Sequence, residues 1–419
     1  MKVHLMTIGD ELLIGQVVNT NASWLGEQMV IRGAEVVRMV TVPDELDLIV
    51  EELRYAVDDA DLVIMTGGLG PTHDDLTRDA IAAFLGVGLA QDDAVVEVIR
   101  ERFSRRGKEM PARNAVQAMV PAGCEVLPNQ VGTAPGLWFE GEQVKLCALP
   151  GVPHEMRTLM REHVIPRVTT DQRIRPLAQR TILTAGIGES DLQERLGDAS
   201  QWLGPDQKLA YLPQIGGVRL RLMAYSDSWD EAGRQLEAME NLVRARIKQH
   251  IYGTDEDMLE RRIGQLLVAT HQTVAVAESC TGGLIGDRLT NISGASAYFK
   301  GGVVAYSNDV KHRILGVEED VLDKHGAVSE QAALQMAEGV RRLLATDIGV
   351  SVTGIMGPSG GSKEKPVGTV WIGFADQHST RARCVLTQKD RIRNKKYASS
   401  YALNTLWYAL NQISNRKLS

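Results

Sequence analysis

A serine, a tyrosine and a lysine in the last third of the chain could together carry out acyl transfer. Ser279 and Thr281 lie in the glycine-rich turn AESCTGG, which follows a run with strand character, and Tyr306 and Lys311 lie in GGVVAYSNDVK, at the end of another such run. A serine hydroxyl attacks an amide only when a nearby base takes its proton, and a neutral lysine or a tyrosine can be that base. The backbone N–H groups of a strand-to-helix turn can also bind an anion or an oxyanion.

Each of these residues also has a simpler structural interpretation. Ser279 and Thr281 could be helix caps, worth about 1 kcal/mol each. Tyr306 could be a surface aromatic, and Lys311 could be a solvated charge. Cys280 is a rival nucleophile, but no histidine base stands beside it in the sequence, which favours a buried structural thiol. The spacing of these residues therefore leaves their function open.

A second set of reactive residue types lies in the first third of the chain. The loop TGGLGPTHDDLTRDA, residues 66–80, follows an apolar run and opens a helix, so it offers glycine N–H groups to phosphate and carboxylates to a cation. Asp75 and Asp79 could be simple helix N-terminal acids. We nevertheless expect Asp10 and Asp44 at the same rim, and carboxylates beside a phosphate cradle are typical of magnesium-assisted phosphoryl chemistry.

Two α/β patterns position these loops. Over residues 1–168, short apolar runs alternate with amphipathic helical runs, which predicts a parallel sheet covered by helices. Ligands bind at the carboxyl ends of the strands of such sheets, so the loops 9–15, 41–45 and 66–75 should share one rim. The pattern resumes over residues 254–419, where four strand ends carrying hydroxyls or glycines should converge on one pocket.

Residues 169–253 differ from both patterns. The alternation in VRLRLMAY suits a half-exposed antiparallel strand, and a hairpin backed by helices predicts a small α+β module. No reactive groups are concentrated there, which favours a linking or oligomerisation role. The sequence thus predicts three domains, 1–168, 169–253 and 254–419.

Composition excludes several classes of protein. A chain of 419 residues exceeds what one hydrophobic core usually organises, and its net charge of −7 argues against nucleic acid or an anionic membrane as a partner. No window reaches the roughly 18 apolar residues of a membrane helix, and the N-terminus lacks the pattern of a signal peptide. The four cysteines form no framework, as expected for reduced thiols. We therefore expect a cytoplasmic protein.

The C-terminal motif series AESCTGG, GGVVAYSNDVK, GAVSEQ, SVTGIMGPSGG and EKPVGTVWIG resembles the C-terminal domain of the competence/damage-inducible protein A (CinA) family. Stand-alone relatives of that domain are nicotinamide-nucleotide amidases, so the resemblance implies cofactor-free hydrolysis of nicotinamide mononucleotide to nicotinate mononucleotide and ammonia. It implies that Ser279 is the nucleophile and that Tyr306 and Lys311 activate it and shuttle protons. The expected substrate-binding residues are Thr281, Gly282, Thr353, Gly354, Gly357 and Arg391. Met356 departs from the smaller residue that is common in relatives and could narrow the pocket.

The N-terminal pieces IGDELLIGQVVNTNASWLG, VPDE, TGGLGPTHDDLTRDA and PGVPHEM resemble the three-layer molybdopterin-binding fold, and more closely the CinA N-terminal domain. The resemblance implies a divalent-metal-dependent ADP-ribose pyrophosphatase that releases AMP and ribose 5-phosphate. Pterin binding is the competing role. The predicted ligands of magnesium or cobalt are Asp10, Asp44, Asp75 and Asp79, and the predicted pyrophosphate-binding residues are Thr66, Gly67, Gly68 and Gly70.

The whole chain is therefore interpreted as an α/β, bifunctional enzyme of pyridine-nucleotide salvage, and we expect a homodimer because glycine-rich sites at strand ends are often completed by a neighbouring subunit. One alternative is a nucleotide- or pterin-binding regulatory protein in which one or both sites are inactive. The retained reactive residues argue against it. A second alternative is a recombination factor acting on DNA, against which the acidic balance and the lack of a basic aromatic face count.

Overall fold

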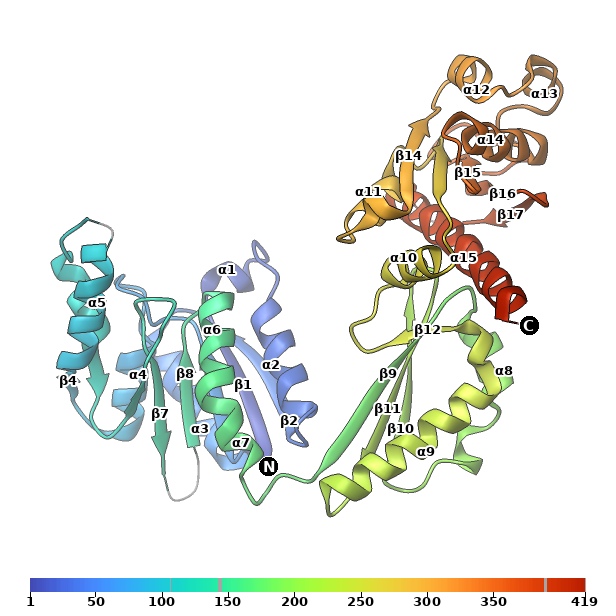
Figure 1. Cartoon of the computed structure of the whole chain (residues 1–419). Coiled ribbons are helices and arrows are strands. Elements are labelled where there is room, and N and C mark those ends of the chain that lie inside the picture. Colours follow the sequence, from blue (N-terminus) through green and yellow to red (C-terminus); the bar gives the residue numbers. More distant parts are fainter. Residues whose placement is uncertain (106, 142–144, 388–389, 419) are drawn as a thin grey trace. The chain divides into compact units, whose positions relative to one another are not determined.

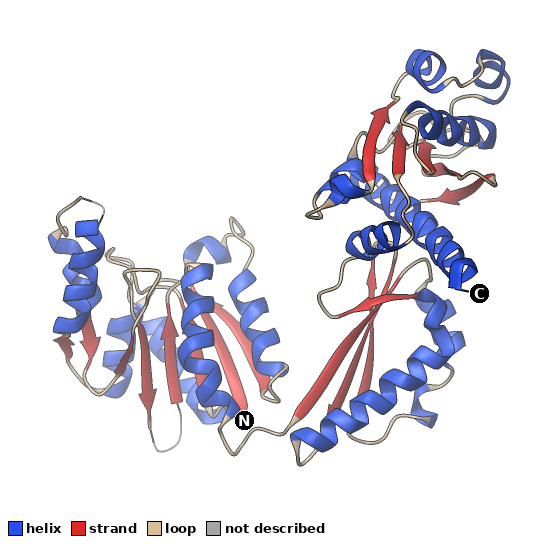
Figure 2. Ribbon diagram, viewed as in Figure 1, coloured by secondary structure: helices blue, strands red, loops and turns tan. Residues whose placement is uncertain are grey.

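The computed structural model describes residues 1–105, 107–141, 145–387 and 390–418. The chain forms two compact units (Figure 1). The first contains Met1–Ala178 and Ala224–Gln235, and the second contains Gln179–Met223 and Leu236–Ser419. Each sheet is flanked by helices, which confirms the predicted mixed α/β class (Figure 2).

The sheet of the first unit has the strand order β2-β1-β3-β8-β7-β6. Its strands are β1 (Lys2–Ile8), β2 (Glu35–Val42), β3 (Leu62–Thr66), β6 (Glu125–Leu127), β7 (Gly136–Glu140) and β8 (Lys145–Leu149). Strands β2, β1, β3 and β8 are parallel, as predicted, but β7 is antiparallel to β8 and β6 is antiparallel to β7. The expectation of a wholly parallel sheet was wrong because these last strands follow one another through connections too short for a parallel crossover.

Helices cover both faces of this sheet and give it three layers. Side chains of β1 alternate between two cores: Val3 and Leu5 pack with one cluster, and Met6 and Ile8 pack with the other. Helices α2 and α6 contribute to the first cluster, and α3 and α4 to the second. The helices are α1 (Asp10–Leu13), α2 (Thr20–Val30), α3 (Leu46–Asp59), α4 (Thr77–Leu85), α5 (Asp93–Arg105), α6 (Pro153–Leu159) and α7 (Ile165–Thr169), and a π-helical turn at Met160–Val164 joins α6 to α7. Strands β4 (Leu89–Gln91) and β5 (Met119–Pro121) form a separate two-stranded sheet.

A four-stranded sheet follows in the middle of the chain, in the order β10-β11-β9-β12. Along β11 the side chains alternate between buried and more exposed positions, as its sequence predicted. The strands are β9 (Leu177–Thr184), β10 (Gln207–Gln214), β11 (Gly217–Tyr225) and β12 (Ile251–Thr254), and the helices are α8 (Glu189–Leu196) and α9 (Trp229–Ile247). This is the predicted α+β composition, to which the structure adds β12.

The C-terminal sheet has the order β14-β13-β15-β16-β17. Strand β13 is parallel to both β14 and β15, so the carboxyl ends of these strands meet at one rim, whereas β16 and β17 run antiparallel. The strands are β13 (Val274–Glu278), β14 (Phe299–Val304), β15 (Ile348–Gly354), β16 (Thr369–Ala375) and β17 (Thr380–Leu386). The helices are α10 (Leu259–Ala269), α11 (Leu284–Thr290), α12 (Asn308–Leu315), α13 (Glu319–His325), α14 (Glu330–Leu343) and α15 (Arg391–Leu418).

This sheet also separates two cores. Val274 and Val276 of β13 pack with residues of α10, α11 and α15, whereas Ala275 and Ala277 pack with residues of α14.

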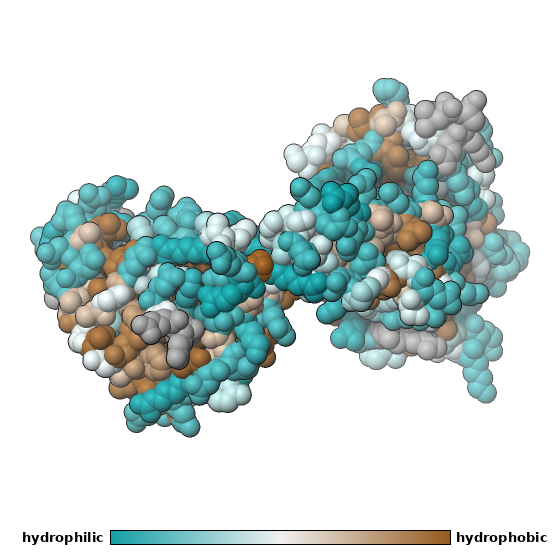
Figure 3. Space-filling view, turned by 90° about the horizontal axis from the view of Figure 1, so that it is seen from below, coloured by the Kyte–Doolittle hydropathy of each residue, from teal (hydrophilic) through white to brown (hydrophobic). Residues whose placement is uncertain are grey.

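On the face of the molecule shown in Figure 3, hydrophilic side chains predominate and hydrophobic ones gather in separate patches. None of the helices in the described part of the chain is long and apolar enough to cross a membrane.

Candidate functional sites

The turn that follows β13 carries the predicted nucleophile. Ser279 is buried, with 8% of its surface exposed, and its N–H donates to the carbonyl of Val352 at 2.9 Å. Gly282 and Gly283 have φ angles of 64° and 99°, in the left-handed region that glycine adopts without strain. These two glycines allow the chain to leave the strand, reverse and enter α11 directly beside Ser279.

Glu278, the residue before the serine, holds this turn in place. Its carboxylate is buried and accepts from the backbone N–H groups of Gly283 at 3.0 Å, Ile285 at 3.0 Å and Gly286 at 2.8 Å. These three N–H groups are therefore not free to bind an anion, and of the turn itself Ser279 also uses its N–H, to Val352. Within the described residues, the N–H groups of Thr281 and Gly282 have no hydrogen-bond acceptor, and that of Gly282, the exposed residue of the two, remains available to an oxyanion.

Lys311 lies against Ser279 in the interior. It projects from α12 with 1% of its surface exposed, and its Nζ lies 3.1 Å from Ser279 Oγ, 2.9 Å from the carbonyl oxygen of Ala305 and 3.4 Å from that of Tyr306. No ion-pair partner faces it from the described part of the chain. Burial therefore lowers the pKa of Lys311 from its ordinary value, opposed weakly by Cys280.

The three neighbours of Lys311 suit a neutral amine. A neutral amine has two N–H groups and one lone pair, and the two carbonyl oxygens can take the two N–H groups. In the folded chain Lys311 Nζ donates to Ser279 Oγ, and once the lysine has lost a proton its lone pair can face Oγ and accept from the Ser279 hydroxyl. This is the arrangement that proton transfer from a serine to a general base requires.

Tyr306 and Arg391 lie together at a more exposed position. Tyr306 is 64% exposed, and its hydroxyl accepts from Arg391 Nη2 at 3.1 Å. Arg391 Nη1 donates to the carbonyl of Gly357 at 2.8 Å, so this arginine joins the segment after β14 to the segment after β15. Among the hydrogen bonds of the described residues, none links the Tyr306 hydroxyl to Ser279 or Lys311. The structure thus brings Ser279 and Lys311 together and sets the tyrosine hydroxyl beside Arg391.

The end of β15 supplies the other predicted binding residues. Thr353 is buried and donates its hydroxyl to the carbonyl of Ala327 at 2.7 Å, whereas the fully buried hydroxyl of Thr281 has no partner among the residues described. A Cβ at Gly354 would lie 2.8 Å from the carbonyl oxygen of Thr369, so a larger residue would not fit there. Met356 is buried in the hydrophobic core of this domain.

The predicted N-terminal site is a cleft of about 420 Å³ at the rim of the first sheet. Its lining includes the backbone of Gly67, Gly68 and Gly70 together with carboxylates from several loops, but no lysine or arginine. An anion entering this cleft therefore meets negative charge that no side chain of the lining offsets. The carboxylates are Glu11, Asp44, Asp74, Asp75 and Glu155.

The glycine-rich loop is closely packed. Gly67 has a φ of 111°, and a Cβ there would lie 2.2 Å from the carbonyl oxygen of Ile8. A Cβ on Gly151 would lie 3.4 Å from the Cα of Gly67, so the turn before α6 packs directly on the loop. Thr66 is fully buried and its hydroxyl donates to the carbonyl of Pro150 at 3.1 Å, which leaves the glycine backbone as the part of the loop that faces the cleft.

Asp75 and Arg78 hold this loop from two sides. Asp75 accepts from the N–H groups of Gly70 and Thr72, each at 2.8 Å, and from the Thr72 hydroxyl. The buried guanidinium of Arg78 donates to the carbonyls of Leu69 at 2.7 Å and Gly70 at 3.0 Å, and burial lowers its pKa. Both oxygens of Asp75 are thus already committed to loop structure.

Asp10 and Asp44 meet at the rim, as the fold predicts. Asp10 N–H donates to Asp44 Oδ2 at 3.0 Å, and Asp44 N–H donates to Asp10 Oδ1 at 3.4 Å. Burial raises the pKa of Asp44, as do the nearby charges of Asp10, Glu11 and Asp74. Asp79 is exposed in the first turn of α4, and neither it nor Asp10 lines the cleft. In the described ranges, no three His, Cys, Asp or Glu side chains are grouped so as to hold a metal ion.

Three protein-family models match successive parts of the chain. Residues 4–170 match a probable molybdopterin binding domain, residues 179–253 the damage-inducible protein CinA KH domain, and residues 256–410 the CinA C-terminal domain. A CinA-like protein of Salinibacter ruber is 49% identical over 96% of this chain and 98% of its own length. The chain belongs to the CinA family. A CinA-like protein of Chloroherpeton thalassium is 42% identical over 98% of this chain and 100% of its own length.

A solved structure of the CinA protein from Thermoplasma acidophilum is also similar. It shares 36% sequence identity, covers 39% of this chain and 97% of its own, and has a TM-score of 0.37. The CinA resemblance predicted from the motifs is thus confirmed by full-length relatives, as is the fold class of a molybdopterin-binding-like domain, a small middle domain and a CinA C-terminal domain.

The match of the middle domain to a KH domain goes beyond the small α+β module predicted from the sequence. KH domains clamp the nucleic-acid backbone with a GXXG loop. No two glycines stand three positions apart between residues 179 and 253 of this sequence, so that loop is missing. This agrees with the prediction that nucleic acid is not a partner, which stays a prediction.

Sequence reasoning missed several residues of the CinA C-terminal site. Glu278 was overlooked although it precedes the serine in AES, and fully buried Asn394 donates to the carbonyl of Met356 at 3.0 Å. Lys395 was missed as well, and its Nζ lies 3.6 Å from the position of a Cβ at Gly282. Lys395 follows Arg391 by one helical turn, and that spacing was the available signal.

Proposed function

We propose that the C-terminal domain hydrolyses nicotinamide mononucleotide to nicotinate mononucleotide and ammonia without a cofactor. The observation that carries this proposal is the buried Lys311, which touches Ser279 Oγ at 3.1 Å and has no ion-pair partner among the described residues. A desolvated lysine of lowered pKa is a suitable base for activating a serine. The cytoplasmic location and the homodimer expected from the sequence stay predictions.

The reaction follows from this pair. Ser279 Oγ attacks the carboxamide carbon of the substrate while Lys311 Nζ takes the hydroxyl proton. The backbone N–H group of the exposed Gly282 can stabilise the oxyanion. Lys311 then gives the proton to the leaving nitrogen, ammonia departs, and an ester remains on Ser279. Water, deprotonated by Lys311, cleaves this ester, which releases nicotinate mononucleotide and restores the serine.

Two cationic side chains support a nucleotide as the substrate. Arg391 lies at the mouth of the site beside Tyr306, and Lys395 lies beside Gly282 of the catalytic turn. A phosphate group is the part of nicotinamide mononucleotide that such cations would attract. The hydroxyl of Tyr306 accepts from Arg391, so in this proposal the tyrosine positions that arginine rather than carrying a proton.

The test is ammonia release from nicotinamide mononucleotide by the full chain, with a chelator present. The wild type should release ammonia, and Ser279→Ala and Lys311→Ala should each lower kcat by about a thousandfold or more, because each removes one half of the reacting pair. The exposed Ser293 provides a matched control, and Ser293→Ala should behave as the wild type does. A wild type that binds the nucleotide without releasing ammonia would contradict the proposal and favour a sensor.

A second activity, metal-dependent hydrolysis of ADP-ribose to AMP and ribose 5-phosphate, is proposed for the N-terminal cleft. The observation that favours it is a glycine-rich loop beside five carboxylates with no cationic side chain in the lining. A pyrophosphate could enter such a cleft only with a cation, and magnesium prefers carboxylate oxygen ligands. Asp44, together with Glu11 and Asp74, would hold magnesium or cobalt, which would supply charge neutralisation for the pyrophosphate, while Asp75 would hold the loop beside them.

Asp44 tests this second proposal better than Asp75, because loss of Asp75 would also release the loop that it holds. AMP release from ADP-ribose should require added magnesium or cobalt and should fall at least about tenfold in Asp44→Asn, since the cleft would hold the cation less well. The exposed Asp58 of α3 is the control, and Asp58→Asn should keep the full rate. AMP release that persists in a chelator would refute the metal requirement. Tight pterin binding without AMP release would favour the competing role.

A further inference from the structure

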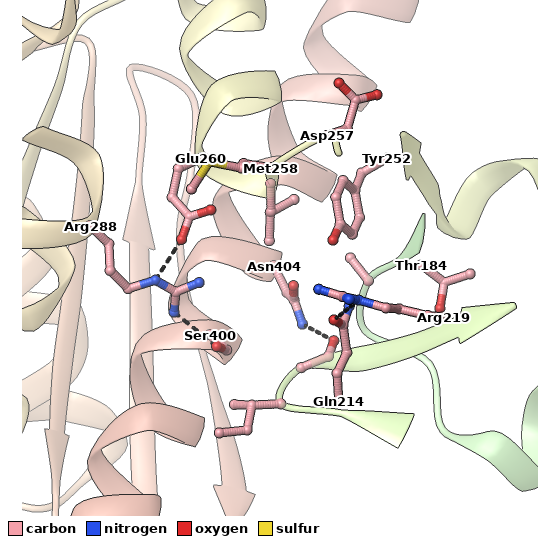
Figure 4. A pocket seen from close by; sticks show the side chains of 14 residues that line it. Thr184, Gln214, Arg219, Tyr252, Asp257, Met258, Glu260, Arg288, Ser400 and Asn404 are labelled. Atoms are coloured by element: carbon pink, nitrogen blue, oxygen red, sulfur yellow. Dashed lines mark hydrogen bonds and ion pairs between the residues drawn. The ribbon is translucent and has the colours of Figure 1, made fainter. Parts of the chain in front are cut away.

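A second pocket lies inside the second unit, between the middle sheet and the C-terminal domain (Figure 4). Its volume is about 200 Å³, which leaves room for several waters or for one small molecule. The catalytic residues Ser279 and Lys311 are not part of its lining. The polar lining residues used below are Gln214, Arg219, Asp257, Glu260, Arg288 and Asn404.

Close contacts between the two domains fix the walls of this pocket. Asn404 Nδ2, on α15, donates to the carbonyl of Gly216 in the turn between β10 and β11 at 2.9 Å. Gly216 has a φ of 90°, and a Cβ there would lie 2.9 Å from the Cβ of Ser400, so the turn approaches the helix as closely as only glycine permits. Tyr408 donates its hydroxyl to the carbonyl of Ala185 at 2.7 Å beside the same pocket.

One buried atom in this pocket lacks a partner. Asn404 is fully buried, and its Oδ1 has no hydrogen-bond donor among the residues that the structure describes. A buried polar atom left unsatisfied destabilises the folded state, and such atoms are uncommon in native proteins. An N–H or O–H donor on a molecule that occupies the pocket would satisfy Asn404 Oδ1.

The charges around the pocket balance. Arg288 Nε donates to Glu260 at 2.6 Å, and its Nη1 donates to Ser400 at 2.8 Å, as Figure 4 shows. Arg219 donates from Nε to Gln214 Oε1 at 2.8 Å and has no carboxylate partner within the described ranges.

With Asp257, the lining holds two guanidinium groups and two carboxylates, so its formal charge is zero. A polyphosphate or a lone metal cation would find no net opposite charge here.

We propose that this pocket binds a small zwitterion of the class of the free α-amino acids. The ammonium group would donate to Asn404 Oδ1, and the carboxylate would accept from the guanidinium group of Arg219. Because the pocket is built from both domains, the ligand would stabilise the contact between them and raise the unfolding temperature of the second unit by mass action. The proposal does not depend on amidase activity, since the pocket does not include the reacting residues.

The experiment is a thermal-unfolding screen of the full chain with each standard L-amino acid, followed by calorimetric titration of those that raise the unfolding midpoint. Inorganic phosphate and magnesium chloride serve as comparison probes. At least one amino acid should raise the midpoint and bind with one-to-one stoichiometry. A screen in which no amino acid shifts the midpoint, or in which only phosphate or magnesium does, would overturn the proposal.

Arg219→Ala locates the binding. The Arg219 side chain is exposed, so its loss should leave the ligand-free midpoint unchanged, but amino-acid affinity should fall about tenfold or more because the carboxylate loses a charge-assisted partner. Arg234→Ala, which removes an exposed arginine of α9 outside the pocket, should keep the wild-type affinity. Equal affinity in Arg219→Ala and the wild type would place the amino acid elsewhere and refute the site.

Discussion

In the C-terminal site the reacting groups already touch in the folded chain, whereas in the N-terminal cleft the carboxylates bind backbone N–H groups. Ser279 Oγ and Lys311 Nζ lie 3.1 Å apart with the lysine buried. In the cleft, Asp75 accepts from its own loop and Asp44 accepts from the N–H group of Asp10. The first site presents an assembled pair, and the second presents a negatively charged cleft.

Burial has opposite consequences for these two sites. It lowers the pKa of Lys311 and so favours the neutral amine that can act as a base, an effect that a neighbouring carboxylate would oppose. In the cleft, burial and neighbouring charges raise the pKa of Asp44, which makes this carboxylate less ready to ionise until a cation arrives. A single buried lysine can thus act as a base without a charged partner. Clustered carboxylates, by contrast, need a bound cation before they can bind an anionic substrate.

Lys311→Met gives the largest expected effect. It should lower kcat for nicotinamide mononucleotide by about a thousandfold or more, because the base is lost, yet the protein should remain folded since methionine suits a buried position. In the wild type, kcat/KM should rise with pH through a single ionisation below the ordinary lysine pKa of 10.5, as Lys311 loses its proton. Steady-state rates measured over a range of pH test both the loss of kcat in Lys311→Met and the ionisation in the wild type.

The pH dependence of the free energy of unfolding tests whether the pKa of Lys311 is lowered in the folded protein. Between the lowered pKa and 10.5 the unfolded chain binds more protons than the native protein, so Lys311 opposes folding at neutral pH and this cost fades as pH rises. Urea unfolding of Lys311→Met should therefore lack that rise of stability with pH. The exposed Lys324, changed to Met, is the control and should keep the wild-type rate and pH profile. A Lys311→Met protein with wild-type activity would show that Lys311 is not the base, and the C-terminal site would then hold no assembled reacting pair.

Glu278→Gln tests whether the assembled pair depends on the turn beneath it. The glutamine offers one oxygen to three N–H donors and sets its own NH₂ against the others, so unfolding should become easier by about 1 to 3 kcal/mol. A displaced Ser279 should lower kcat by about 10- to 100-fold, with KM little changed. Urea unfolding and steady-state kinetics measure the two effects.

Glu330→Gln is the matched control, since Glu330 is an exposed residue in the first turn of α14. It should leave both stability and rate unchanged. If Glu278→Gln lowers stability but not kcat, Glu278 serves the fold alone and has no part in positioning the serine.

The fold could be predicted where hydrophobic periodicity and motif order were strong. The apolar run before the loop 66–80 forms β3, and the runs that end at AESCTGG and within GGVVAYSNDVK form β13 and β14. The antiparallel strands β6, β7 and β17 were not foreseen, because a short apolar run does not reveal the direction in which it will pair. That choice depends on the length of the connection and on the edge left free in the sheet.

The candidate sites were predictable only by residue type. The sequence indicated Ser279 and Lys311 as partners, but not that two carbonyl oxygens would surround the lysine. Glu278 and Arg78 were missed because their partners are backbone groups, which carry no signature in the sequence. Four aspartates were expected to act together, yet only Asp44 and Asp75 of that set line the cleft, because the side chain of Asp79 leaves α4 on an exposed face.

Cys280→Ala is expected to have the smallest effect, and it decides which residue of the turn is the nucleophile. Cys280 is 6% exposed and packs in the core of its domain, and burial raises the pKa of its thiol to about 12. Almost no thiolate exists at neutral pH, so the ammonia-release rate of Cys280→Ala should stay within about threefold of wild type. The lost sulfur should lower stability by about 1 kcal/mol through the small cavity it leaves. A rate that fell as far as in Ser279→Ala would move the nucleophile to Cys280 and leave Lys311 as the base of a thiol enzyme.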